Sequence, residues 1–73
     1  MPVKYDEIRS VPEKRIREYF ASAGTGGCEI AVTPLPERQI GRLSFPQTRV
    51  IIEGERAEEV YRAFSLNFLS GGA

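Results

Sequence analysis

The chain has 73 residues, ten basic and ten acidic, with no net charge, no histidine and a single cysteine. This length fits one small domain over residues 1–73. The composition excludes histidine-based acid–base catalysis, metal sites built from histidine and cysteine, and a disulfide framework. Zero net charge leaves no electrostatic footprint for nucleic acid or anionic lipid.

The N-terminal segment, residues 1–9, is open to two interpretations: its apolar residues form either a short edge strand or an extended arm. The segment has no apolar stretch of the kind found in secretory signals. Apolar runs elsewhere, such as Val50–Ile52, are far shorter than the ~20 residues that span a bilayer. We therefore expect no membrane partner and a cytoplasmic protein, which the single unpaired cysteine also favours.

The first helix is expected to begin at Ser10, because Ser10 followed three residues later by Glu13 is a capping box. A proline such as Pro12 is tolerated in a first turn. Apolar residues then recur at helical spacing. They are Ile16, Tyr19, Phe20 and Ala23. Gly24 stands where a helix ends in a left-handed residue.

Alternation with a period of two follows and predicts strands. Cys28, Ile30 and Val32 point inward in the first strand. A stiff connection at 34–37, a second strand over 38–45, a tight turn at Pro46–Gln47 and a third strand over 49–53 complete the expected sheet. Four residues of these strands are expected to face the core: Leu43, Phe45, Val50 and Ile52.

The last helix is expected from about Glu55 to Leu69, ended by Ser70–Gly72. Its apolar face includes Phe64 and Phe68, which we expect to share one core with Phe20 and the inward strand residues. The elements follow in the order helix, strand, strand, strand, helix. This order predicts an α+β two-layer sandwich with a three-stranded antiparallel sheet and two helices packed on one face.

Residues expected outside the core indicate a contact surface. Two isoleucines and several arginines fall on the sheet face that the helices leave open, and isoleucines rimmed by arginines are typical of an interface. A domain this small, without metal or disulfide, gains stability by association. We therefore predict a homo-oligomer, with a dimer favoured. Its interface residues are Ile40, Arg42, Arg49, Ile51 and Leu66.

Charge complementarity suits such a dimer, since Arg42 or Arg49 of one chain can meet Glu29 or Glu53 of the other. The competing account is a monomer in which residues 1–9 fold back over the open face and cover its isoleucines.

The sequence points to a non-catalytic, self-associating domain without catalytic, cofactor or metal residues. One alternative is a nucleic-acid-binding module that uses Arg38, Arg42 and Arg49 on the sheet face. With Phe45 expected inward, no aromatic side chain is available there for stacking, so no nucleic-acid partner is expected. A second alternative is a small-ligand or thiol-dependent protein using Cys28, although no histidine exists to act as its base. Abundant arginine and glutamate indicate either heat tolerance or codon usage in a GC-rich genome.

Overall fold

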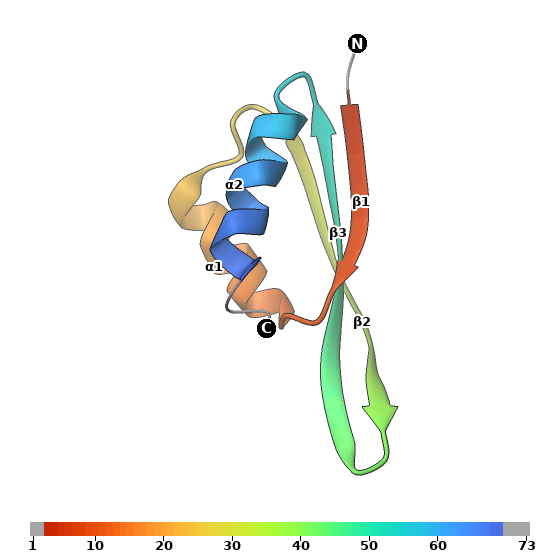
Figure 1. The fold of residues 1–73 in the computed structure, drawn as a ribbon. Helices are drawn as coiled ribbons and strands as arrows, with labels where there is room; N and C mark the ends of the chain where they lie inside the picture. The colour runs from red at the N-terminus through yellow and green to blue at the C-terminus, as the bar shows by residue number, and fades with distance from the viewer. Residues whose placement is uncertain (1–2, 70–73) are drawn as a thin grey trace.

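The computed structural model describes residues 3–69, drawn in Figure 1. The elements are β1 (Val3–Arg9), α1 (Glu13–Ala23), β2 (Glu29–Ile40), β3 (Leu43–Gly54) and α2 (Ala57–Leu69). The three strands form one antiparallel sheet in the order β1-β3-β2. The predicted helix stop at Ser70–Gly72 lies outside the described residues.

Both helices cover the same face of the sheet (Figure 1), with α1 against β2 and α2 against β1 and β3. The predicted α+β class, with a three-stranded antiparallel sheet and two helices on one face, is therefore confirmed. The element order differs from the prediction, because a strand, β1, precedes α1 and two strands, not three, lie between the helices. Of the two interpretations of the N-terminal segment, the edge strand is correct for residues 3–9.

The strand boundaries within residues 28–54 were predicted wrongly. The strands β2 and β3 have 12 residues each and form a single hairpin that turns at Gly41–Arg42. The expected connection at 34–37 and the expected turn at Pro46–Gln47 both lie inside strands. Prolines are tolerated there because β2 is an edge strand and because β1 pairs with β3 only from Thr48 onward.

Beyond the end of β1 the hairpin continues as a two-stranded ribbon, which we call the arm and define as residues 35–47. It projects past the helices in Figure 1 and gives the molecule its long axis of 43 Å. A register shift between Leu35 and Arg38 marks a bulge in β2 where the arm leaves the body.

Leu43 and Phe45 do not face the core, which corrects the prediction. Their exposed fractions are 63% and 37%, whereas Val50 and Ile52 are each 1% exposed. A turn at Pro46–Gln47 would have reset the alternation of faces. Because β3 runs without interruption, odd-numbered residues share the face opposite to Val50 and Ile52.

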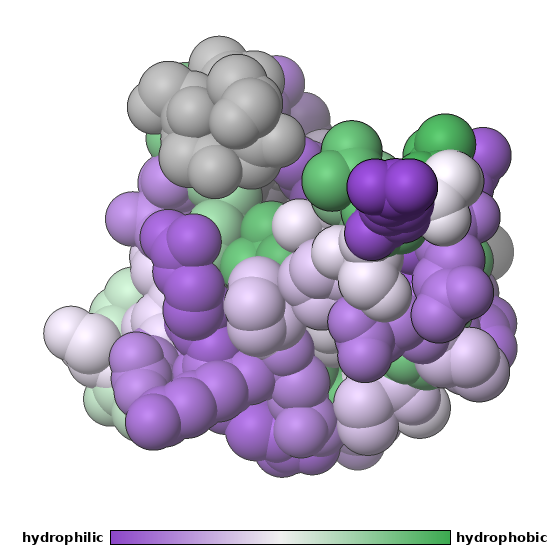
Figure 2. All heavy atoms as spheres, turned by 90° about the horizontal axis from the view of Figure 1, so that it is seen from below, coloured by the Kyte–Doolittle hydropathy of each residue, from purple (hydrophilic) through white to green (hydrophobic). Residues whose placement is uncertain are grey.

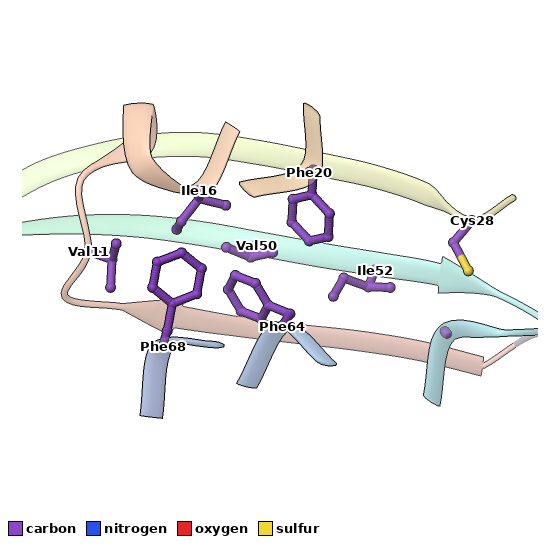
Figure 3. Close-up of a cluster of buried hydrophobic side chains, with 9 residues drawn as sticks. Val11, Ile16, Phe20, Cys28, Val50, Ile52, Phe64 and Phe68 are labelled. Atoms are coloured by element: carbon purple, nitrogen blue, oxygen red, sulfur yellow. The ribbon is translucent and has the colours of Figure 1, made fainter. Parts of the chain in front are cut away.

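The core lies between the helices and the inner face of β3 (Figure 3). Phe20 of α1 stacks on Phe64 of α2 with ring centroids 5.4 Å apart, and Phe68 lies 5.1 Å from Phe64. These rings cover Val50 and Ile52, so the predicted sharing of one core by the three phenylalanines is confirmed. Several half-buried residues pack around it: Tyr5, Tyr19, Ile30, Val32, Val60 and Tyr61.

The start of α1 differs from the predicted capping box. Pro12 is the N-cap residue, no side chain caps the helix, and the carbonyl of Pro12 accepts hydrogen bonds from the N–H groups of Arg15 and Ile16. The carboxylate of Glu13 instead accepts a hydrogen bond from Arg17. Because the helix begins at Glu13, Ser10 lies too far upstream to cap it.

The segment before α1 is tied to the sheet by Thr48. This side chain is buried, and its hydroxyl donates a 2.7 Å hydrogen bond to the carbonyl oxygen of the buried Val11. We expect Thr48→Val to lower the free energy of unfolding by about 1–3 kcal/mol, because the Val11 carbonyl would lose this partner in an apolar environment. Urea unfolding measures the loss. Thr25→Val, at an exposed residue of the loop between α1 and β2, serves as control, and equal stabilities of the two variants would contradict the assignment.

Candidate interaction surface

The sheet face turned away from the helices, which we call the open face, is uncovered in Figure 1. Its residues follow from the register and from the alternation of side chains along each strand. In the body of the sheet they are Lys4, Asp6 and Ile8 on β1, Arg49, Ile51 and Glu53 on β3, and Glu29, Ala31 and Thr33 on β2.

Large apolar side chains are exposed along this face. Ile8 is 58% exposed on β1, and the arm adds Ile40 at 53% beside Leu43 and Phe45. The same alternation that removes Leu43 and Phe45 from the core puts them on the face of Ile51. Figure 2, which views the molecule from the hairpin end, shows hydrophobic surface next to strongly hydrophilic surface. Such clustering on one face is typical of an interaction site.

The two ends of the open face carry opposite charge. At the end far from the arm, Glu29 and Glu53 are directly opposite each other on neighbouring strands, with Lys4 opposite Glu53 on its other side. Like charges in such a cross-strand pair repel. The arm carries Arg38 and Arg42, and neither belongs to an ion pair within residues 3–69.

The middle of the face is neutral because Arg49 is already paired. Its Nε and Nη2 atoms donate to the two carboxylate oxygens of Asp6, at 2.9 and 2.5 Å. The hydrogen bond from Arg49 lowers the pKa of Asp6 below its ordinary value, and the same contact raises the pKa of Arg49. Arg49 therefore has its charge satisfied within the chain, unlike the role expected from the sequence.

Four of the five residues predicted for the interface lie on the arm or the open face: Ile40, Arg42, Arg49 and Ile51. Leu66 does not join them, because it is 72% exposed on α2, in the helix layer. The sequence prediction missed Leu43, Phe45 and Ile8. An unbroken alternation from Leu43 to Glu53 was the signal that would have placed the first two.

Residues 3–9 lie in the plane of the sheet and not over it, which corrects the account in which they cover the open-face isoleucines. On the inner face, β1 is held to α2 by polar contacts. The Tyr61 hydroxyl donates to Glu7 at 2.7 Å, and Arg9 donates to Glu7 and, at 3.0 Å, to Ser65. These groups fasten the edge strand, so the open face keeps its exposed apolar residues.

Cys28 and the carboxylates form no separate site. The thiol is buried at the end of the core (Figure 3), and a side chain added at Gly54 would meet its Sγ atom. Within residues 3–69, no three Asp, Glu or Cys side chains gather closely enough to hold a metal ion.

Comparison of the chain with protein-family models, curated proteins and solved structures found no match. Neither helix in the described part of the chain is long and apolar enough to cross a membrane.

Proposed function

We propose that the protein is a non-catalytic domain that self-associates through its open face and arm, in the simplest case as a homodimer. The observation that carries the proposal is the gathering of Ile8, Ile40, Leu43 and Phe45 as exposed side chains on one side of the sheet. A chain of 73 residues buries little apolar surface by itself. Covering this face in an assembly adds the burial that the monomer lacks.

The dimensions of the face suit a stable interface. The chain extends 43 Å along its long axis and 20 Å along the next. One whole face therefore offers an area on the order of the ~800 Å² that each partner contributes to a standard interface. The arm is essential to this area, because it supplies three of the four most exposed apolar side chains on the open face.

The test is the molar mass in solution, measured by light scattering during size-exclusion chromatography at high micromolar concentration. We expect the wild-type chain to have at least twice the mass of a single chain. Phe45→Glu is expected to give a folded monomer, because a buried unpaired carboxylate disfavours association while Phe45 contributes nothing to the core.

Leu66→Glu is the matched control, since it places the same charge on an exposed residue of the helix layer, and it is expected to keep the wild-type mass. A monomeric wild-type chain would contradict the proposal, as would a Phe45→Glu variant that still associates. Circular dichroism of each variant verifies that the fold is retained.

The second candidate function is nucleic-acid binding by the arm. The observation in its favour is that Phe45 lies on the open face directly opposite Arg38, which supplies the stacking side chain that the sequence interpretation lacked. Against it stand the zero net charge, the pairing of Arg49 with Asp6, and Glu37 within the arm. Sub-micromolar binding of single-stranded RNA or DNA at about 150 mM salt, weakened by Phe45→Ala and by Arg38→Ala, would favour this candidate.

We also propose a cytoplasmic location and a heat-tolerant fold. The single buried thiol suits a reducing compartment. Exposed ion pairs along both helices support heat tolerance, because the desolvation cost of an ion pair falls as the temperature rises. They are Glu13–Arg17, Arg56–Glu59 and Glu58–Arg62.

A further inference from the structure

The two ends of the open face carry side chains of opposite charge. The acidic pair Glu29 and Glu53 lies at one end, and the arginines of the arm, Arg38 and Arg42, lie at the other. Along β3 the ten residue steps from Leu43 to Glu53 separate these ends by about 33 Å, at ~3.3 Å per residue. Salt screens charges at this separation, so the two ends do not neutralise each other within one chain.

Building on the self-association proposed above, we propose that the occupant of the open face is a second copy of this chain, placed face to face and antiparallel. In this arrangement the arm of each copy covers the acidic end of the other, so that Arg38 and Arg42 meet Glu29 and Glu53 across the interface. A twofold axis makes this contact twice. The parallel arrangement would oppose arginine to arginine and glutamate to glutamate, and like charges facing each other disfavour association.

The same arrangement matches one apolar pair on β3, while Leu43 of one copy lies over Glu53 of the other, next to the arginines of the arm. The midpoint between Phe45 and Ile51 along β3 is Thr48. A twofold axis that crosses the strands at this level sets Phe45 of one copy over Ile51 of the other. It also brings the Ile8 side chains of the two copies near each other. The neutral Asp6–Arg49 pair lies close to the axis, where an uncompensated charge would be the most costly.

The edges of the sheet offer a different mode of association, by addition of strands. Pro34 and Pro36 remove N–H donors from the edge strand β2, which discourages pairing there. The edge of β1 has no proline in residues 3–9, so pairing of β1 with β1 of a second copy is the competing arrangement. In this β1–β1 arrangement the arm makes no contact with the second copy. Charge reversal on the arm would therefore leave its association unchanged, which distinguishes it from the antiparallel arrangement.

The experiment is a charge-swap series. One variant reverses the arm (Arg38→Glu with Arg42→Glu), and the other reverses the acidic end (Glu29→Arg with Glu53→Arg). Each variant alone opposes like charges twice, so we expect its self-association to weaken by about tenfold or more. Mixing the two variants restores opposite charges at both contacts. We expect the equimolar mixture to form a heterodimer, detected by native mass spectrometry, with an affinity close to that of the wild-type homodimer.

The control is Arg56→Glu with Arg62→Glu, which makes the same change of charge on exposed residues of the helix side and is expected to leave association unchanged. If a double variant does not fold, the single variants Arg42→Glu and Glu53→Arg replace the pair, since Arg42 lies at the turn and Glu53 is exposed.

The outcomes separate this pairing from the proposed function. Association that both charge variants retain at wild-type strength, or that the mixture does not restore, would overturn the antiparallel arrangement. If Phe45→Glu still dissociates the protein in that case, the open face remains the interface with another orientation. If Phe45→Glu associates as well, the β1 edge is the interface. A monomeric wild-type chain would overturn both the pairing and the proposed function.

Discussion

Replacing Phe64 by alanine is expected to lower the free energy of unfolding by about 3–5 kcal/mol. Phe64 is completely buried and contacts the rings of Phe20, Phe68 and Tyr19, while the guanidinium of Arg9 lies 5.4 Å from its ring centroid. The cavity would open at the junction of both helices with the sheet. Because small domains have only about 5–15 kcal/mol of stability in total, the variant is expected to be close to unfolded at ambient temperature.

Urea unfolding followed by circular dichroism measures this loss. Leu66→Ala, two residues further along α2, is the control, and we expect a change within about 0.5 kcal/mol because its side chain is exposed. If Phe64→Ala is too unstable for a folded baseline, Phe64→Leu provides a milder truncation at the same place. A loss for Phe64→Ala no larger than that for Leu66→Ala would show that the two faces of α2 have been exchanged.

Gly54→Ala is expected to lower the free energy of unfolding by about 2–6 kcal/mol, from two separate causes. The residue ends β3 with a φ of 151°, a region that L side chains rarely adopt, and such strain costs about 1–3 kcal/mol. An added Cβ would also lie 3.1 Å from Sγ and 3.2 Å from Cα of Cys28. Overpacking against backbone of this kind costs a further ~1–3 kcal/mol.

Gly24→Ala separates the two causes. Gly24 also has a positive φ, 83°, but an added Cβ there would meet no atom within 4 Å. We therefore expect Gly24→Ala to lose the strain contribution alone, and Gly54→Ala to be the less stable of the two in urea unfolding. Equal losses would mean that the contact with Cys28 relaxes without cost, and no loss in either variant would contradict the left-handed backbone at both positions.

Local patterns in the sequence were sufficient for the helices and for the centre of the core. The spacing of Ile16 and Phe20 in α1, and of Phe64 and Phe68 in α2, selects one helical face, and a helix that buries this face has few alternatives. In the same way, Val50 and Ile52 are the alternate, inward-facing residues of the β-branched run Val50–Ile52. The α+β class and the layer of two helices on one face follow from these residues.

The candidate surface was predictable in part. Ile40 and Ile51 are on the arm or open face as expected, because each is an outward strand position whichever way the prolines are interpreted. Arg42, expected at an outward strand position, lies at the turn of the arm. Whether Arg49 is free could not be read from the sequence, because its partner Asp6 is 43 residues away and reaches it only through the pairing of β1 with β3. Leu66 is exposed on α2, on the side of the sheet opposite to the open face. The sequence could not show this, because the packing of the helix decides on which side of the sheet its exposed side chains lie.

The sequence by itself therefore determined which segments with strong periodicity form helices or strands, and which of their residues are buried. Both depend on neighbours within one or two turns. The tertiary structure decided how long the strands are and which way the arm faces. Pro34 and Pro46 predict breaks locally, but a strand accepts proline wherever its N–H would have no partner. That condition is met only because β2 lies at the edge and β1 stops at Arg9. Uninterrupted alternation then turns Leu43 and Phe45 toward solvent and creates the apolar surface on which the proposed assembly depends.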